Sequence, residues 1–202
     1  LVELEQASGR DLRSWVHKWL ETSGVNLLRP VIEIDEQGMI TSAVIEQSVA
    51  SGDDLLRPHR LEIGAYDLVD GRFVRTGVIS LDVDGPRTAV PQLIGAARPA
   101  VILVNDADLA YAKIRFDPLS LAAILAHPRG FTDTLPHSLA LAAVWDMTRD
   151  AQMRARDFRP FALAALDGER DSTLVRSLLG QIATCVTHYV APEHRAAAHQ
   201  LV

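Results

Sequence analysis

The spacing of apolar residues changes twice along this chain, and the changes divide it into three parts. Apolar residues, among them Trp15 and Trp19, recur at helical spacing and predict one amphipathic helix over residues 3–22. After Ser23-Gly24 the apolar period falls to two residues, and after Asp117-Pro118 it becomes helical again. We therefore expect a helix, then a β region, then a helical region.

The middle part predicts an all-β domain. We expect short strands at residues 31–35, 39–47, 60–68, 72–83, 87–92, 100–104 and 110–115. Gln37-Gly38, Asp70-Gly71 and Asp84-Gly85 tolerate positive φ, which favours hairpin turns between these strands. About seven short strands without helices between them indicate an antiparallel β-sandwich of immunoglobulin-like architecture. The term describes architecture only, because the cysteine-tryptophan-cysteine pattern of immunoglobulin domains is absent.

The last part predicts an all-α domain, a bundle or a superhelical array. Asp117 is a good N-cap and Pro118 suits the first position of a helix. Helices are expected at residues 118–127, 135–149, 157–166 and 172–190. The fold class is therefore mixed, an all-β region followed by an all-α region.

Both ends of the sequence lie inside helical patterns. Leu1 is not an initiator methionine, and the run that begins at Pro192 reaches Val202 without a C-terminal stop signal. We expect a piece of a longer polypeptide.

Composition limits the classes of partner and the compartment expected for this chain. The 202 residues are 48% hydrophobic, which allows a sizeable core, yet apolar runs such as Ala100–Val104 are too short to span a bilayer. A net charge of −6 and scattered arginines argue against nucleic acid as a partner. Cys185 is the single cysteine, so no internal disulfide can form, and a reducing compartment, the cytoplasm, is expected. The predicted partners include neither nucleic acid nor membrane.

The search for a metal site yields no candidate ligand set. His-Glu-x-x-His is absent, and His194 and His199 are five positions apart. For these two residues, and for His17 and His59, solvated or singly hydrogen-bonded side chains are the preferred interpretation. The sequence therefore predicts no catalytic, cofactor-binding or metal-binding residues.

Other chemistry is equally sparse. Gly-x-Ser-x-Gly and the glycine-rich phosphate loops are absent, while a Ser/His/Asp triad assembled only in space stays open. The polar segment Asn105–Lys113 favours a hydrogen-bonded turn over a calcium site, because the central glycine and terminal glutamate of a calcium loop are missing. Trp145 is expected to pack in the helical core, with Arg149 forming ion pairs with the nearby aspartates. Cys185 is expected to be a small buried hydrophobic residue.

Three stretches, in order, resemble the zinc-dependent aminopeptidase N family in its actinobacterial form. They are Asp11-Leu12-x-x-Trp15-x-x-x-Trp19-Leu20-x-Thr22-x-Gly24-Val25-Asn26, Leu103-Val104-Asn105-Asp106-x-Asp108-Leu109-x-Tyr111-x-Lys113 and Ala143-x-Trp145-Asp146-Met147-x-Arg149-Asp150. The similarity covers essentially the whole chain. It implies that residues 1–27 are the terminal helix of a missing catalytic domain, 28–116 the β-sandwich domain, and 117–202 part of the helical C-terminal domain.

The resemblance also implies what this chain lacks. The zinc ligands and general base of that family lie in His-Glu-x-x-His with a downstream glutamate, and amino-terminus recognition lies in Gly-x-Met-Glu-Asn; neither motif occurs here. No catalytic residue is carried over. The expected function is that of a non-catalytic part of a zinc metallo-aminopeptidase, with the sandwich as spacer and the helices as part of the cap over the active site. Zinc belongs to the parent enzyme and not to this part of it.

The implied partners are the missing catalytic domain of the same polypeptide and, through the parent enzyme, peptide substrates. The alternative is a free-standing protein-interaction module, a sandwich joined to a helical scaffold. In the first case the Trp15/Trp19 stripe belongs to the missing domain, and in the second it folds back on this chain's own sandwich.

Overall fold

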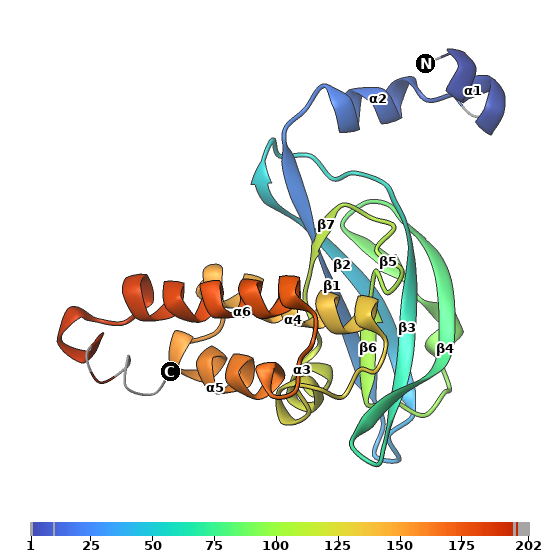
Figure 1. Ribbon diagram of the computed structural model, residues 1–202. Helices are drawn as coiled ribbons and strands as arrows, with labels where there is room; N and C mark the ends of the chain where they lie inside the picture. The colour runs from blue at the N-terminus through green and yellow to red at the C-terminus, as the bar shows by residue number, and fades with distance from the viewer. Residues whose placement is uncertain (1, 10, 196, 198–202) are drawn as a thin grey trace. The chain divides into compact units, whose positions relative to one another are not determined.

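The computed structural model describes residues 2–9, 11–195 and 197. Its N-terminal segment forms two short helices, α1 (Val2–Ser8) and α2 (Arg13–Leu20), so the prediction of one continuous helix is wrong (Figure 1). Gly9 adopts a φ of 65° and donates its N–H to the Glu5 carbonyl at 2.8 Å, which ends α1. The Glu5 carboxylate then accepts the Leu12 N–H at 2.9 Å and stabilises the turn into α2.

The middle part forms two sheets, as the two-residue period predicts. β1 (Gly24–Ile34), β2 (Ile40–Gly52), β5 (Arg87–Ala89) and β7 (Ala112–Ile114) form one sheet in the order β5-β2-β1-β7. β3 (His59–Val69), β4 (Arg72–Val83) and β6 (Val101–Val104) form the other in the order β4-β3-β6. The seven predicted strands are confirmed, although β1 begins earlier than expected and β5 ends before a 3-10 turn at Pro91–Leu93.

The pairing in the larger sheet is not purely antiparallel. β1 and β2 form a long antiparallel ladder from Gly24↔Gly52 to Ile34↔Ile40, whereas β1 pairs with β7 in parallel, Asn26 opposite Ala112. The prediction of an antiparallel sandwich is wrong for this pair. A hairpin forces its two strands to be antiparallel, but β7 enters after β6 of the other sheet, so no hairpin sets its direction.

The β4 strand shows how the sequence pattern sets its two faces. Asp70 and Gly71 have φ values of 49° and 75°, the pair of positive angles that a type I′ hairpin turn between β3 and β4 requires. Beyond the turn, Phe73, Leu81 and Val83 are buried while Val74, Thr76, Ser80 and Asp82 are exposed. The strand predicted at residues 72–83 is therefore buried on one face and exposed on the other.

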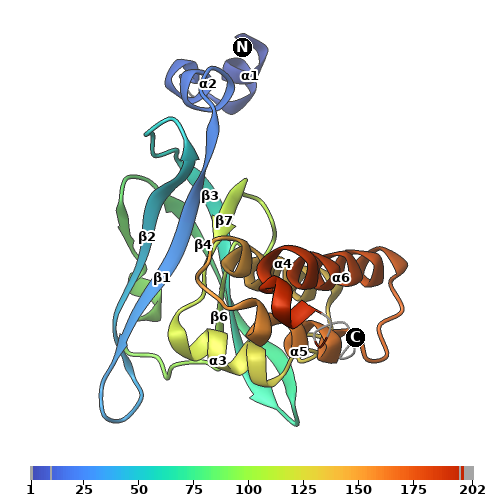
Figure 2. The same ribbon diagram turned by 90° about the vertical axis from the view of Figure 1, so that its left-hand side faces the viewer.

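Helices follow, at the predicted places. They are α3 (Pro118–Ala126), α4 (Thr134–Arg149), α5 (Ala155–Leu166) and α6 (Ser172–Thr184), with a π turn at Cys185–Tyr189 and a 3-10 turn at Pro192–His194. The predicted helix over residues 172–190 thus widens into a π turn in its last part. α5 contacts both α4 and α6, and Figure 2 shows these helices together. A mixed fold, two sheets and then helices, is confirmed.

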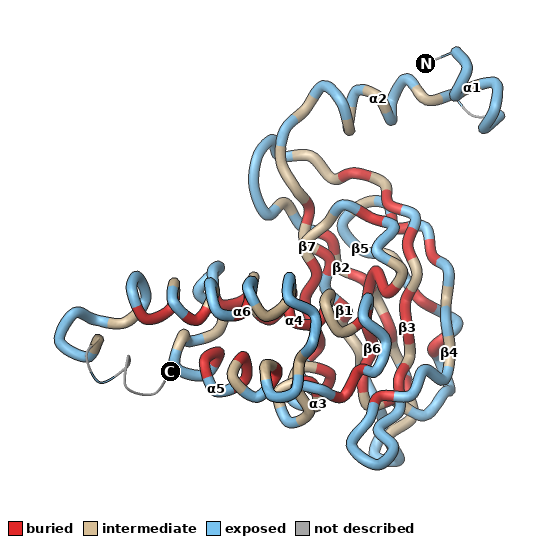
Figure 3. Tube along the Cα trace, viewed as in Figure 1, coloured by how far each residue is buried: buried red, intermediate tan, exposed pale blue. Residues whose placement is uncertain are grey.

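Contacts group the chain into two compact units that do not follow chain order. The first contains Leu1–Gly64, Val78–Arg98 and Val104–Asp117; the second contains Ala65–Gly77, Pro99–Leu103 and Pro118–Val202. The tip of the β3–β4 hairpin therefore belongs with the helices. Each unit has fully buried apolar side chains, such as Leu28 and Leu61 in the first and Val144 and Phe158 in the second. Figure 3 shows buried positions along both the strands and the helices. Among the described residues, none of the helices has the length and apolar content needed to cross a membrane.

Candidate functional site

In the first unit, the C-terminal end of α2 is held by a buried arginine. Arg57 is 2% exposed and comes from the loop between β2 and β3. Its Nε donates to the Lys18 carbonyl at 2.7 Å, and its Nη2 donates to Thr22 Oγ1 and to the Ser23 carbonyl, both at 2.8 Å. The last carbonyls of a helix carry partial negative charge, so a guanidinium is a favourable cap at this end.

Trp19 completes the attachment of α2. The Arg57 Cζ lies 5.6 Å from the centre of the Trp19 ring, and the His59 ring meets Trp19 edge to face at 5.3 Å between centroids. His59 is 4% exposed, and burial, followed by the positive charge of Arg57, lowers its pKa from the ordinary 6.5 to about 4. The expectation of a solvated or singly hydrogen-bonded side chain is wrong for His59, because the first residue of β3 faces inward.

The rest of the N-terminal segment stays exposed. Neither α1 nor α2 has a buried residue, and Val2, Leu4, Trp15 and Leu20 are 62%, 57%, 39% and 69% exposed. In Figure 3 both helices appear blue and tan throughout. The Trp15/Trp19 stripe is therefore split: Trp19 packs on the β region of its own chain, and Trp15 does not.

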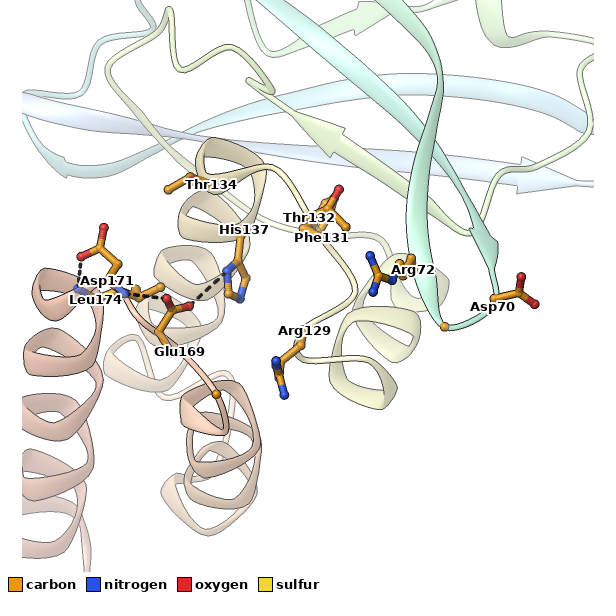
Figure 4. A pocket seen from close by; sticks show the side chains of 12 residues that line it. Asp70, Arg72, Arg129, Phe131, Thr132, Thr134, His137, Glu169, Asp171 and Leu174 are labelled. Atoms are coloured by element: carbon orange, nitrogen blue, oxygen red, sulfur yellow. Dashed lines mark hydrogen bonds and ion pairs between the residues drawn. The ribbon is translucent and has the colours of Figure 1, made fainter.

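The second unit contains a cavity of about 720 Å³ with charged walls (Figure 4). Arg72 beside the hairpin turn and Arg129 after α3 contribute positive charge, while Glu169 and Asp171, between α5 and α6, contribute negative charge. Asp171 caps α6, because its carboxylate accepts the Thr173 and Leu174 N–H groups at 2.7 and 3.1 Å. The arrangement provides charge of both signs for binding.

His137 of α4 connects two loops of this cavity. Its Nε2 lies 3.2 Å from the Pro128 carbonyl oxygen, and its Nδ1 lies 3.8 Å from a Glu169 carboxylate oxygen. Burial lowers the pKa of His137, against opposing effects of Glu169 and the Pro128 carbonyl. Backbone N–H donors, Asp171 first, lower the pKa of Glu169, so the ionised carboxylate is the favoured form. The residues lining the cavity include neither serine nor cysteine.

The Asn105 segment forms the predicted turn. The Asn105 side chain donates to the Ala110 carbonyl and accepts from the Ala110 N–H, each at 2.9 Å, and the Asp108 N–H donates to the Asn105 carbonyl at 2.8 Å. Asn105 and Asp108 have φ values of 63° and 54°, which asparagine and aspartate tolerate better than most residues. The interpretation as a hydrogen-bonded turn is confirmed.

The helical candidates are also where the sequence places them. Trp145 packs against Phe158 at 5.1 Å and stacks with Tyr189 at 6.3 Å between centroids, while Arg149 Nη1 lies 3.6 Å from Asp146 Oδ1. Cys185 is fully buried, and burial raises its thiol pKa to about 11. Its role as a small buried hydrophobe is confirmed.

The remaining histidines do not converge. His17 contacts Glu21 at 3.0 Å on an exposed helix face, His194 is exposed, and His199 lies outside the described residues. Over the described ranges, no three His, Cys, Asp or Glu side chains are close enough to hold a metal ion. The described residues therefore do not fit a zinc site.

Sequence reasoning missed two groups. Arg57 lies in a loop with no periodic signal, and arginine is rarely buried, so neither position nor type indicated its role. His137 and Glu169 are far apart in sequence and meet only where α4 lies beside the loop between α5 and α6. Asp171 before Ser172 could have been recognised as an N-cap from the sequence.

Comparison with known proteins identifies the family. A family model described as "ERAP1-like C-terminal domain" matches residues 101–202, half of the chain. Aminopeptidase N of Streptomyces lividans is 50% identical over 204 aligned residues, which cover 98% of this chain and 24% of that protein. The resemblance to aminopeptidase N is thereby confirmed.

A solved structure shows a similar fold. The crystal structure of aminopeptidase A from Legionella pneumophila, in complex with aspartic acid, matches with a TM-score of 0.52 and 16% identity. The match covers 98% of this chain and 23% of that one, so the chain spans about a quarter of the length of each relative. The chain belongs to the ERAP1-like C-terminal domain family and is similar to one part of aminopeptidase N.

Proposed function

We propose that this chain is a non-catalytic part of a cytoplasmic zinc aminopeptidase that removes N-terminal amino acids from peptides. The observation that carries the proposal is 50% identity over nearly the whole chain to an aminopeptidase N of which it covers only 24%. The sequence contributes no His-Glu-x-x-His motif, and the described residues do not fit a zinc site. Zinc, when bound elsewhere in such an enzyme, supplies the activated water for peptide hydrolysis.

In this proposal the chain has three parts with separate roles. Residues 1–27 end the catalytic domain, 28–116 form an immunoglobulin-like spacer, and 117–202 begin the helical cap over the active site. Support comes from the exposed apolar side chains of α1 and α2, which offer a surface for the catalytic domain, and from the family match to residues 101–202. A cap of this kind positions peptides and excludes water.

The alternative, a free-standing interaction module, has one observation in its favour. Trp19 packs against Arg57 and His59 of its own chain, as expected if the N-terminal helical segment folds back on the β region of the same chain. Trp15 and Leu20 remain exposed, however, and favour the first reading. Because Arg57 binds residues at the end of α2, deleting residues 1–22 would destabilise the chain under either reading. Point substitutions at exposed positions are the sharper test.

The test combines this chain with a separately produced zinc-containing catalytic part of the enzyme. We expect no release of product from fluorogenic amino-acid amides by the chain alone, no stoichiometric zinc by elemental analysis, and a changed peptide-length preference in the mixture. Leu20→Ser should weaken the association, whereas Val74→Ser, at an exposed strand position, should not. Chelator-sensitive activity of the chain alone would contradict the proposal. Failure of the two parts to associate would favour the interaction module.

A further inference from the structure

The junction of α2 with the β region contains buried polar atoms that lack partners. Trp19 Nε1, Arg57 Nη1, both ring nitrogens of His59, and Gln47 Oε1 are buried without a hydrogen bond. These are five of the eight such side-chain atoms found among the described residues. Buried polar groups in folded proteins nearly always have partners, in the protein or in ordered water, so their concentration at one place makes this junction a candidate binding site. We call these four residues the Arg57 cluster.

The scaffold around Arg57 is fixed, which makes the cluster a built site. Asn26 accepts the Arg57 N–H at 3.0 Å and donates to the Leu55 carbonyl at 2.8 Å. Gln47 donates to the Arg57 carbonyl at 2.9 Å. The Arg57 side chain is held by the three oxygens at the end of α2. The Arg57 side chain is thus fixed in one conformation, and one of its nitrogens, Nη1, has no hydrogen-bond acceptor.

The positive charge of Arg57 indicates that an anion, rather than a neutral molecule, would suit this site. All three acceptors of its side chain are neutral oxygens, and among the described residues no carboxylate pairs with it. The Asp53 carboxylate accepts the Ser23 N–H at 2.7 Å instead. Burying a cation without a counter-charge is unfavourable, and a well-placed anion can offset part of that cost. A water molecule would complete the hydrogen bonds but would add no negative charge to the partial charge of the oxygens at the end of α2.

The free donors suit a small anion. Arg57 Nη1, Trp19 Nε1 and the one N–H of neutral His59 are three donors without a partner, and Trp19 lies beside both other residues. Gln47 Oε1 and the second His59 nitrogen are acceptors, so the ion must lie on the donor side. We propose that the Arg57 cluster binds one small monovalent anion, a halide or a compact carboxylate, between α2 and the β region.

The site would couple anion binding to the placement of α2. The anion would contact Trp19 of α2 together with Arg57 and His59 of the β region. It would therefore stabilise the position in which α2 is packed against the β region. Ligands that bind only the folded state raise stability by mass action. The inference is independent of the catalytic role of the parent enzyme.

The test measures the melting temperature of the chain at constant ionic strength while sodium chloride or sodium formate replaces sodium gluconate, whose anion is much larger than either. A rise of roughly 3–6 °C is expected when the small anion reaches ten times its Kd. Trp19→Phe deletes the Nε1 donor but keeps an aromatic ring, and should lose at least half of this rise. Trp15→Phe, on the same helix but exposed, is the matched control and should keep it.

The two salts distinguish the source of the anion. A rise with chloride indicates a halide site, and a rise with formate alone indicates a carboxylate; either supports the proposal. Equal melting temperatures in all three salts, or equal rises in the Trp19 and Trp15 variants, would overturn it.

A second measurement needs no variant. NMR titration of His59 should show its pKa rising from about 4 when chloride replaces gluconate, because a nearby anion favours the protonated ring. An unchanged His59 pKa at saturating chloride and formate would count against the site. A bromide soak of crystals should place an anomalous peak within hydrogen-bond distance of Arg57 Nη1.

Discussion

Two buried arginines of the first unit are held in opposite ways. Arg98 Nη2 lies 2.5 Å from the Asp117 carboxylate, and the two side chains are 8% and 4% exposed. Arg57 is equally buried but is held by carbonyl and hydroxyl oxygens at the end of a helix. The first cation has its counter-charge in the chain, immediately before Pro118 of α3, and the second does not. A buried arginine can therefore serve as a paired structural link or as a site that requires something from solution.

The largest expected effect comes from breaking the paired arginine. Asp117→Ala removes the carboxylate that pairs with the buried Arg98 side chain, and should lower the free energy of unfolding by about 3–5 kcal/mol. Urea denaturation measures the change. The control is Asp82→Ala, which removes an exposed ion pair with Arg60 and should cost less than about 1 kcal/mol. Similar losses for the two variants would contradict the distinction between buried and exposed pairs.

Acid should destabilise the chain mainly by protonating His59, which lies beside the unpaired Arg57. The His59 pKa is about 4 when folded and near 6.5 when unfolded, so the unfolded chain binds the proton more readily. The resulting stabilisation, about 3 kcal/mol at most, is fully present above pH 6.5 and is lost as the pH falls from there to about 4. The stability profile of His59→Asn should be flatter over this range.

His17→Asn is the control for the acid experiment, because His17 is exposed and paired only with Glu21 on the surface. His137 also has a lowered pKa and should leave part of the acid sensitivity in both variants. The difference between the wild-type and His59→Asn profiles isolates the contribution of His59. A difference that does not change between pH 7 and pH 4 would show that His59 titrates normally.

Replacing the unpaired arginine should cost less than breaking the pair. Arg57→Met removes three hydrogen bonds to the end of α2 but also removes an uncompensated buried charge, so we expect a loss of about 2 kcal/mol. Arg87→Met, at an exposed position beside Glu46, is the control. Urea denaturation compares them, and a loss for Arg57→Met larger than that for Asp117→Ala would reverse the comparison.

The smallest expected effect is at the exposed face of α2. Leu20→Ser should change the stability of this chain by less than about 0.5 kcal/mol, because Leu20 is 69% exposed. Trp19→Ala, on the same helix, should cost more, since Trp19 contacts both Arg57 and His59. Thermal unfolding of the pair tests whether Arg57 and Trp19, rather than the exposed stripe, hold α2 in place.

Local sequence patterns were enough to predict the order and type of the elements. Alternating apolar residues gave the strands, Asp70-Gly71 gave the β3–β4 turn, and the proline at 118 gave the start of α3, because each is a local preference of a few neighbouring residues. Local patterns also indicated the Asn105 turn and the burial of Cys185. The same reasoning failed at Gly9, where one residue in a left-handed conformation divides a continuous apolar stripe into two helices.

The pairing of distant groups depends on tertiary packing and could not be predicted from local patterns. The parallel pairing of β1 with β7, the contact of His137 with Glu169, and the packing of Trp19 against Arg57 each join residues 30 or more positions apart. Such contacts depend on how sheets and helices pack, and the sequence period does not encode that packing. Charge burial is the clearest case: arginine is a surface residue by type, and only the surrounding α2 carbonyls, Trp19 and β3 make Arg57 a buried cation without a counter-charge.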